Sequence, residues 1–417
     1  MSSSPIFYGW WVAAAFSVMV FVSAGVRHAV GPFLKPMVAD LGVDRGAFSL
    51  VIALGLFLYG AFMPWVGGLA DRLGARLVTS VGAVVLAASL ALTGLCQNLW
   101  QLALVYGLLA SVGLAATGPV VANAVITRWF SRRRGTAVSI LGSASMTGMS
   151  LLVPVAAWLI LTVGWRMTYA LIGLAVLVGM LPLCLLVVRD SPESIGLGPD
   201  GEAALPEPTG VAAVRTPAVT AMRTVAFWQL AGSFFTCGFS MSLVSAHGVP
   251  MLTDHGYSPL FASWVIGILG ASSIGFTLML GGLADRFGAR PVLGAIYGGR
   301  ALIFAGLFLV RDNPLAMLGV AIAGGLTLAG SMSMTSMLTA DIYGRFSVGS
   351  ILGVIFLVHQ TGAALGSWLA GALFESTGGY GAAFAMACAL LAGAGLVSVR
   401  IDSGTRVLRW AARGAGA

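Results

Sequence analysis

The stretch that decides the fold is Gly67-Gly-Leu-Ala-Asp-Arg-Leu-Gly-Ala-Arg76. The same ten residues return 214 positions later as residues 281–290, with Leu73 replaced by Phe287. Other landmarks repeat at the same offset: Gly135 with Gly349, Thr147-Gly148 with Thr361-Gly362, and Gly164 with Gly378. The chain is therefore two copies of one unit, and its function is expected where the copies meet.

Composition indicates that the chain lies in a membrane. Hydrophobic residues make up 58% of the 417 residues, and charged residues make up only 9%. A soluble domain carries about 25% charged residues. Apolar runs of about 20 residues, long enough to cross ~30 Å of hydrocarbon, follow one another along the chain. We expect an all-α membrane protein with twelve transmembrane helices in two pseudo-symmetric six-helix bundles, the spans being 8–30, 47–69, 76–95, 100–124, 134–158, 166–188, 224–249, 261–283, 290–310, 314–338, 348–370 and 380–400.

The basic residues predict the orientation of the chain. The net charge is +8, and most Lys and Arg residues fall in one set of loops and tails. This distribution indicates topology rather than a nucleic-acid partner. By the positive-inside rule, both termini and the middle loop are expected in the cytoplasm, with the protein in the inner cell membrane. The proline-rich middle loop is typical of a flexible linker, so we expect an N-terminal bundle at 1–190, a linker at 191–223 and a C-terminal bundle with a short tail at 224–417.

Twelve spans in two similar halves, with a long middle loop, resemble the major facilitator superfamily. The motif that carries the resemblance is Gly68-Leu-Ala-Asp71-Arg72-x-Gly74-x-Arg76, between spans two and three, with a copy ending at Arg290. It is similar to the G-x-x-x-D-R-x-G-R-R signature of that superfamily and implies its fold. An acidic residue beside an arginine at a helix end can form a latch with neighbouring helix termini. We therefore expect gating roles, rather than plain loop turns, for Asp71, Arg72, Asp285 and Arg286.

Two shorter motifs resemble the monocarboxylate transporters within that superfamily. Tyr8-Gly9-Trp10-Trp11 opens the first span as a Gly/Trp-rich signature does in that family. Residues 129–137, Trp-Phe-Ser-Arg-Arg-Arg-Gly-Thr-Ala, resemble an aromatic-Phe-x-basic-Arg-x-x-Ala element of that family and of the oxalate/formate antiporters. Trp and Arg also belong at membrane interfaces, but the combination favours this branch. One feature departs from it: the family usually carries an Arg in span eight, and residues 276–280 hold no charge.

Two arginines fall inside the expected spans. A charged side chain at bilayer depth costs on the order of 3 kcal/mol or more, and all 14 acidic residues fall in loops or at span ends. Arg27 and Arg300 therefore lack a buried carboxylate partner, which an anionic substrate could supply by binding the planar guanidinium. Arg27 could instead extend to the outer headgroups. Arg300 could be capped by backbone carbonyls or by Tyr297 and serve structure only, so Arg27 is the better candidate ligand.

Three histidines fall in spans one, seven and eleven, which line the central cavity in the superfamily fold: His28, His247 and His359. The resemblance places His28 in register with a span-one lysine of animal monocarboxylate transporters, and His359 with a span-eleven lysine of the oxalate/formate antiporter. Imidazoles titrate near neutral pH, which favours coupling to protons over exchange of two divalent anions. Gln360 could extend the polar lining of the cavity. Each of these side chains could also serve only in hydrogen bonds between helices.

The sequence thus predicts a monomeric, alternating-access secondary transporter for a small organic anion, with a monocarboxylate as the leading candidate, moved together with a proton. The substrate is expected to bind near the midplane between the halves. The alternatives are an efflux transporter for amphipathic compounds, with a larger cavity lined by Met and aromatic residues, or an anion exchanger of the oxalate/formate type. No enzyme is expected, because no mid-span Asp or Glu could complete a Ser-His-Asp set. No P-loop, metal or cofactor motif is present.

Overall fold

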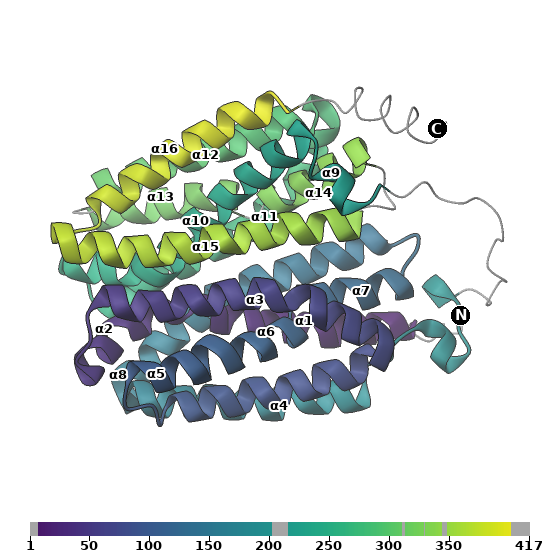
Figure 1. The fold of residues 1–417 in the computed structure, drawn as a ribbon, viewed down its shortest axis with the longest axis horizontal. Coiled ribbons are helices and arrows are strands. Elements are labelled where there is room, and N and C mark those ends of the chain that lie inside the picture. The colour runs from purple at the N-terminus through teal and green to yellow at the C-terminus, as the bar shows by residue number, and fades with distance from the viewer. Residues whose placement is uncertain (1–6, 202–215, 311–312, 329, 344–347, 402–417) are drawn as a thin grey trace.

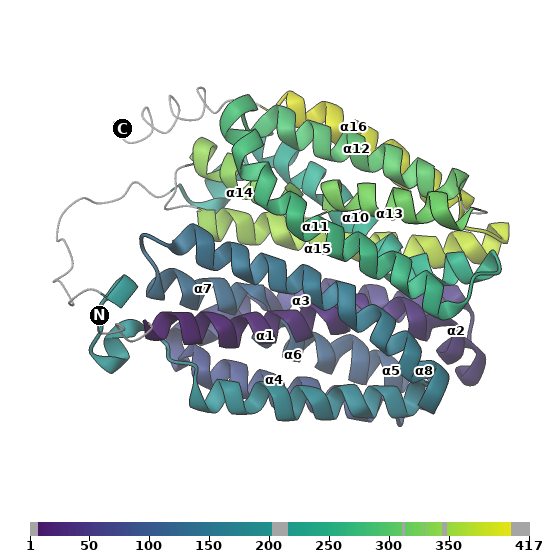
Figure 2. The same cartoon turned by 180° about the vertical axis from the view of Figure 1, so that it is seen from behind.

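The computed structural model describes residues 7–201, 216–310, 313–328, 330–343 and 348–401. In these residues the chain forms helices and helical turns, without strands. The helices lie in two bundles, the first half of the chain below and the second half above in Figure 1. Figure 2 shows the same two bundles from behind. This arrangement confirms the predicted all-α fold of two similar halves.

The N-terminal half contains the first six spans. Span one is α1 (Tyr8–His28), continued by α2 (Val30–Leu41), and spans two and three are α3 (Arg45–Leu73) and α4 (Ala75–Thr93). Span four consists of α5 (Leu99–Leu102), the π-helical segment η1 (Ala103–Ala110), α6 (Ser111–Thr117) and α7 (Pro119–Trp129). Spans five and six are joined in α8 (Arg134–Leu186), which bends at Gly164. The φ of 79° at Gly164 is readily adopted only by glycine.

The C-terminal half repeats this order. Its spans are α10 (Val225–Asp254), α11 (Pro259–Phe287), α12 (Ala289–Leu309), α13 (Pro314–Leu328) with α14 (Gly330–Tyr343), α15 (Val348–Thr377) and α16 (Gly381–Val399). The segment between the halves contains the short turns η2 (Pro192–Ile195) and η3 (Pro199–Gly201) and the helical turn α9 (Ala218–Ala221).

Nine helical segments of the described chain are long and apolar enough to cross a membrane. One of them, Gly135–Leu186, contains two of the expected spans. Helices α10 and α12 are not among the nine. Helix α10 carries many polar residues. Ser233, Thr236, Ser240 and His247 are all buried within the protein. Polar side chains within a membrane span normally face the interior of the bundle rather than lipid. Helix α10 therefore lines the interior of the bundle.

The two ends of the bundle carry different loops. At the linker end, α3 turns into α4, α11 turns into α12, and α8 leads into the segment between the halves. At the opposite end, the Arg45 end, α2 turns into α3 and α10 turns into α11.

The repeat in the sequence is also a repeat of helix contacts. Gly148 of α8 lies against the carbonyl of Phe21 in α1, and Gly362 of α15 lies against the carbonyl of Phe235 in α10. The two glycines are 214 positions apart in the chain, and so are the two phenylalanines. Small residues allow such close approach of helix backbones in membranes. The two halves therefore share their internal packing as well as their motifs.

Replacing Gly148 with leucine is expected to lower the melting temperature of the purified protein. A side chain at this position would overlap the Phe21 carbonyl oxygen, and such overpacking costs about 1–3 kcal/mol. Gly179, in the same helix, offers the matched control, because nothing lies within 4 Å of a Cβ added there. The measurement is thermal unfolding in detergent. Equal melting temperatures for Gly148→Leu and Gly179→Leu would contradict the close contact of α1 with α8.

The two aromatic motifs singled out in the sequence contact each other at the linker end. The ring centroid of Tyr8 lies 5.7 Å from that of Trp129, and the centroid of Trp10 lies 4.7 Å from that of Phe130. The indole Nε1 of Trp129 donates a hydrogen bond of 3.1 Å to the carbonyl of Arg189. This cluster ties the start of α1 to the ends of α7 and α8.

Asp200 holds the start of the linker against the same region. Its Oδ2 accepts hydrogen bonds from the backbone N–H groups of Ser131, at 2.9 Å, and Arg132, at 2.7 Å. Burial opposes ionisation of the carboxyl, but these backbone donors outweigh burial and lower the pKa of Asp200 below its usual value. The ionised carboxylate therefore fixes the linker to the turn between α7 and α8.

The halves contact each other from the Arg45 end to about the middle of the bundle. Helices α3 and α15 run side by side at the junction (Figure 1). A Cβ added to Gly46 would lie 3.7 Å from Ala372, and one added to Gly60 would lie 2.6 Å from Gln360. Helices α8 and α11 also contact each other across the junction, since Gly267 of α11 lies against Ser150 of α8.

Toward the linker end the same helix faces are open. Gly353 lies two turns from Gln360 on the same face of α15, and nothing in the described structure lies within 4 Å of a Cβ added there. The same holds for Gly142, two turns from Ser150 on α8. The junction is thus closed at the Arg45 end and open on these faces toward the linker end.

Candidate functional site

Arg27 and His28 lie inside the first span rather than at its outer end. The sequence placed the end of this span near residue 30, but α2 continues it to Leu41. The 14 residues from Arg27 to Leu41 correspond to about 20 Å of helix. This distance is too great for the Arg27 side chain to reach headgroups at the Arg45 end. The alternative that Arg27 extends to the outer headgroups is therefore not supported.

Arg27 and His28 form a pair with unused hydrogen-bonding capacity. Arg27 Nη2 donates to Nε2 of His28 at 3.1 Å. Because Nε2 accepts this bond, the neutral imidazole carries its proton on Nδ1. His28 is buried, and its Nδ1 has no hydrogen-bond partner among the described residues. Among the described residues, no carboxylate lies at ion-pair distance from Arg27.

A small cavity lies beside the Arg27 guanidinium. Its volume is about 20 Å³, room for about one water molecule. The guanidinium carbon lies 5.5 Å from the centroid of the Tyr59 ring, within the range of a cation–π contact. Ser145 also lines the cavity and is the counterpart of His359 at the 214-residue offset. Equivalent positions of the two halves therefore contribute to this region.

His359 and Gln360 bring the C-terminal half to the same region. His359 Nδ1 and Gln360 Oε1 are 2.8 Å apart, with the amide oxygen accepting. The Phe234 ring covers the imidazole, with centroids 4.4 Å apart. Gln360 is fully buried against Gly60 of α3, across the junction. Gly60 follows Tyr59, whose ring lies beside the Arg27 guanidinium, so polar side chains of both halves contribute to this region.

Arg300 is buried in the C-terminal half and its guanidinium is held by the protein. Nη2 donates to the carbonyl oxygens of Thr327 and Leu328, the latter at 2.9 Å. Nη1 donates to Cys237 Sγ at 3.1 Å. These contacts agree with the carbonyl-capping alternative considered for Arg300. Gly238, which follows Cys237, lies against the carbonyl of His359, and the role of Arg300 as a direct ligand stays a prediction.

The structure does not bring His247 to the other two histidines. His247 is fully buried near the Arg45 end, where its Nε2 lies 2.9 Å from the carbonyl oxygen of Ser367 and 3.3 Å from Oγ of Ser49. Its Nδ1 lies 3.2 Å from the hydroxyl of Tyr380. Both ring nitrogens are therefore engaged, and the expected grouping of all three histidines around one substrate is not observed. Since Ser49 belongs to the other half, His247 joins the two halves.

An ionic cluster closes the Arg45 end beside His247. Asp254 accepts hydrogen bonds from Arg45 at 2.6 and 3.0 Å and forms an ion pair with Lys35 at 2.7 Å. Arg45 also donates to the Tyr380 hydroxyl at 3.0 Å, and its backbone N–H donates to Glu375 at 2.9 Å. Lys35 and Arg45 belong to the N-terminal half and the other three residues to the C-terminal half. Every one of these contacts therefore crosses the junction. We call the five residues Lys35, Arg45, Asp254, Glu375 and Tyr380 the outer cluster.

The family model for the Major Facilitator Superfamily matches residues 16–248 and 230–415. The chain belongs to the Major Facilitator Superfamily. An uncharacterized MFS-type transporter of Bacillus subtilis is 26% identical over 389 residues, covering 89% of this chain and 90% of that protein. Monocarboxylate transporter 11 of Homo sapiens is 27% identical over 399 residues, covering 92% of this chain and 81% of that protein.

The solved structures give the same result for the fold. A D-xylose-proton symporter superposes with a TM-score of 0.75 at 15% sequence identity, covering 95% of this chain and 98% of that one. The family model and the sequence relatives confirm the resemblance to this superfamily and to its monocarboxylate transporters. The protein is a multi-pass membrane transporter of the superfamily, and the proteins that it resembles are transporters rather than enzymes.

In this Major Facilitator Superfamily transporter, the repeated motif forms an ion pair in the first half. Asp71 Oδ1 lies 2.5 Å from Arg128 Nη2 at the end of α7. At the 214-residue offset the counterpart of Arg128 is Ile342, which cannot form this pair. The residue that pairs with Asp71 in the first half therefore has no charged counterpart at the equivalent position of the second half.

The other expected gating residues are less constrained. Arg72 and Arg286 are exposed at the linker end, and the Arg286 guanidinium lies over the ring of Phe287 at 5.3 Å. The side chain of Asp285 lies outside the described part of the structure. The gating role of all four residues stays a prediction.

Sequence reasoning missed Tyr59 and Cys237 in the site and the partner role of Asp254. No pattern in the sequence distinguishes Tyr59 or Cys237 from other buried residues, because their importance depends on neighbours in other helices. A signal for Asp254 was present. Lys35 and Arg45 are two of the few basic residues on the side poor in positive charge, and cations kept there are expected to have an acidic partner.

Proposed function

We propose that the protein moves a small organic anion, with a monocarboxylate as the leading candidate, together with a proton. The observation that carries this proposal is the unpaired cation Arg27, partly buried in the interior of span one and without a carboxylate in reach among the described residues. A charge held at this depth is costly unless it is paired. A substrate carboxylate could bind the guanidinium with two hydrogen bonds and complete the site.

His28 supports both the anion and the proton. Its Nδ1–H is a buried donor without an acceptor among the described residues, and a carboxylate bound to Arg27 could accept from it. Protonation of His28 places a second positive charge beside Arg27, which is unfavourable until an anion offsets both charges. Binding of the anion and of the proton therefore favour each other, which is the linkage that a symporter needs.

The contacts at the junction support alternating access. The outer cluster and the approach of α3 to α15 close the Arg45 end, whereas Gly353 and Gly142 are open toward the linker end. With the linker end in the cytoplasm, as the basic residues predict, this conformation is closed to the outside. Gln360 crosses the junction beside His359, so opening the Arg45 end changes the surroundings of the site. Transport would proceed by rocking of the halves about this region.

Proteoliposomes test the substrate and the coupling together. Uptake of labelled lactate or pyruvate is expected to rise severalfold when the external solution is acidified from about pH 7.5 to about pH 6 at constant internal pH, because imidazoles titrate in this range. A protonophore should reduce the uptake driven by the gradient. The control is the same measurement with liposomes that contain no protein.

Three outcomes would contradict parts of this proposal. Uptake that requires an anion trapped inside the liposomes, without a response to the pH gradient, would favour an exchanger of the oxalate/formate type. Transport of hydrophobic cations in place of carboxylates would favour an efflux transporter for amphipathic compounds. Failure of all small carboxylates to enter, with the protein folded, would exclude the substrate class.

A further inference from the structure

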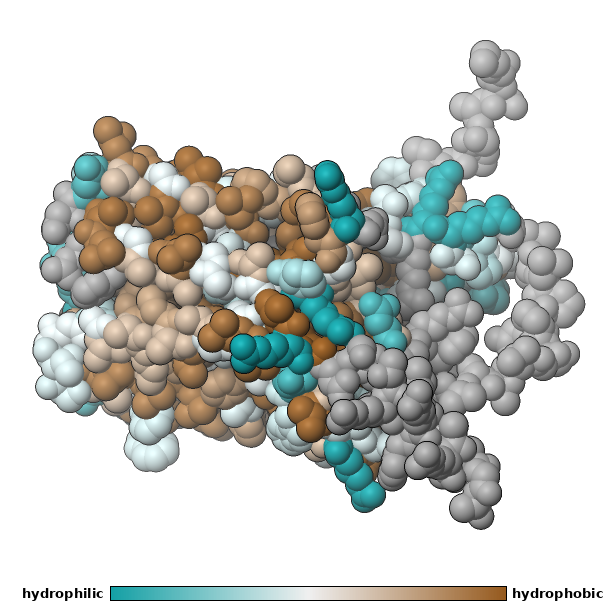
Figure 3. Space-filling model, turned by 90° about the horizontal axis from the view of Figure 1, so that it is seen from above, coloured by the Kyte–Doolittle hydropathy of each residue, from teal (hydrophilic) through white to brown (hydrophobic). Residues whose placement is uncertain are grey.

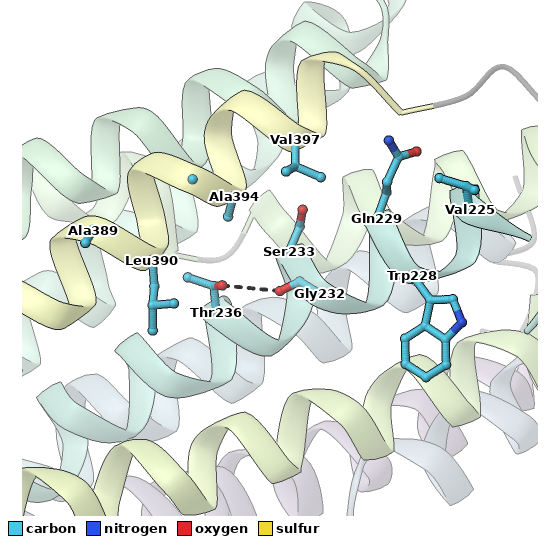
Figure 4. A pocket seen from close by; sticks show the side chains of 11 residues that line it. Val225, Trp228, Gln229, Gly232, Ser233, Thr236, Ala389, Leu390, Ala394 and Val397 are labelled. Carbon is cyan, nitrogen blue, oxygen red and sulfur yellow. Dashed lines mark hydrogen bonds between the residues drawn. The ribbon is translucent and has the colours of Figure 1, made fainter.

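A crevice separate from the candidate site lies between α10 and α16. Its volume is about 450 Å³, within the range of ligand-binding pockets. Figure 4 shows side chains of both helices along it, with Thr236 and Leu390 at one end and Gln229 and Val225 at the other. Its remaining lining includes glycine and other small residues, so neither helix fills the space between them.

The crevice opens onto the surface of the bundle that faces lipid. Val225 and Trp228 at its mouth are 68% and 54% exposed. Figure 3 shows that hydrophobic residues cover much of this half of the molecule and that hydrophilic residues gather toward the linker end. The floor is partly polar, since Ser398 donates a hydrogen bond of 3.2 Å to Ser233. A molecule bound here would therefore come from the bilayer.

The length of the crevice matches one leaflet of a membrane. On α10 its lining runs from Val225 to Thr236, which is about 17 Å at 1.5 Å per residue. Half of the hydrocarbon thickness of ~30 Å is a similar distance. The crevice begins where α10 leaves the segment between the halves, and its lining ends at Thr236, before the middle of α10. An acyl chain of the leaflet at the linker end has the required reach.

The mouth of the crevice is positively charged. Arg223, just before α10, and Arg400, just after α16, are both exposed. The Arg400 carbonyl accepts a hydrogen bond of 3.3 Å from Gln229, a residue that lines the crevice. Trp228 Nε1 bonds to the carbonyl of Met222 at 2.8 Å, and Trp is typical of the headgroup level.

We propose that this crevice binds an anionic phospholipid, with one acyl chain between α10 and α16 and the phosphate at Arg223 and Arg400. The negative charge of the headgroup complements the two guanidinium groups, and anionic lipids are abundant in the cytoplasmic leaflet. The site lies on the outside of the C-terminal half and does not depend on which solute is transported. It is thus a lipid site built into one half, next to the polar helix α10 that contributes to the candidate substrate site.

Two glycines allow the crevice to be filled without disturbing the protein. Nothing in the described structure lies within 4 Å of a Cβ added to Gly232 or Gly393, and both line the crevice. Gly232→Phe and Gly393→Phe are therefore expected to block the acyl chain while leaving the fold intact. Gly179→Phe is the matched control, because Gly179 is also exposed with open space around it but lies on α8.

The experiment is native mass spectrometry of purified protein after incubation with phosphatidylglycerol or phosphatidylethanolamine. The unaltered protein and Gly179→Phe should bind phosphatidylglycerol in preference to phosphatidylethanolamine. Either crevice variant should bind at least about tenfold less phosphatidylglycerol than the unaltered protein. Arg223→Gln combined with Arg400→Gln should keep a bound lipid but lose the preference for phosphatidylglycerol. Melting temperatures measured without added lipid verify that the variants are folded.

The proposal would be overturned if the crevice variants retained as much phosphatidylglycerol as Gly179→Phe. It would also be overturned if the unaltered protein bound both lipids equally, or detergent alone, because the arginine pair would then select nothing.

Discussion

Arg27→Gln is expected to abolish carboxylate transport and to weaken carboxylate binding by at least about 30-fold. Removing one partner of a buried, hydrogen-bonded charge pair costs about 2–5 kcal/mol, and Arg27 is the cation of the site without a carboxylate in reach among the described residues. Glutamine keeps a polar side chain of similar length but loses both the charge and the planar fork. The measurement is stabilisation of the purified protein by pyruvate, followed by thermal shift, together with uptake in proteoliposomes.

Two comparisons separate loss of the anion from loss of the fold. Arg27→Lys keeps the charge but cannot form two parallel hydrogen bonds to a carboxylate, so its binding is expected to lie between those of the other two proteins. Without ligand, Arg27→Gln should melt no lower than the unaltered protein, because it removes an unpaired charge from the membrane. Normal carboxylate binding and uptake by Arg27→Gln would show that Arg27 does not bind the substrate anion.

Asp254→Asn is expected to open the Arg45 end of the protein. The substitution removes the negative charge shared by Lys35 and Arg45 and leaves two cations together on the N-terminal half. Loss of such a partly exposed pair of contacts is worth about 1–2 kcal/mol, which shifts the populations of open and closed forms roughly 5- to 30-fold. Ala39 on α2 and Ser376 on α15 are exposed and can carry spin labels. Double electron–electron resonance should show a longer distance between these labels when the Arg45 end opens.

A second ion pair at the same end provides the control for this experiment. Asp40 and Arg166 lie 2.7 Å apart, but both belong to the N-terminal half. Asp40→Asn removes a similar interaction without touching the junction, so the distance distribution between the labels should not change. Equal effects of the two substitutions, or none from Asp254→Asn, would show that the outer cluster does not hold the halves together.

The architecture followed from the sequence because hydrophobic length and duplication are local properties of the chain. Each apolar run is long enough to cross the bilayer regardless of its neighbours, and the repeat of residues 67–76 at 281–290 requires two similar halves. Even so, the end of span one was misplaced. The break after His28 resembles the end of a helix, but α2 continues the span to Leu41.

The candidate site followed from the sequence only in part. The sequence predicted Arg27 as an unpaired cation from the lack of mid-span acids, and it predicted His28 and His359 as cavity residues from the spans in which they lie. The structure places Arg27 beside His28 and brings Gln360, next to His359, against Gly60 of the other half. His247 is also a histidine within a span, yet it lies beside the outer cluster, where it contacts Ser49 and Tyr380. The position of a side chain along and around its helix decides this difference, and periodicity alone does not define which neighbouring helix it meets.

The sequence by itself determined that this chain crosses the membrane many times in two related halves and that it carries cations without buried acids. Only the tertiary structure decided which polar groups share a site and which close the junction. It showed that Arg45 pairs with Asp254 across the junction, and that the carbonyls of α13 hold Arg300 within one half. The physical reason is that burial in lipid is decided by each segment's own composition, whereas pairing of charges depends on distances of a few ångströms between helices far apart in the chain.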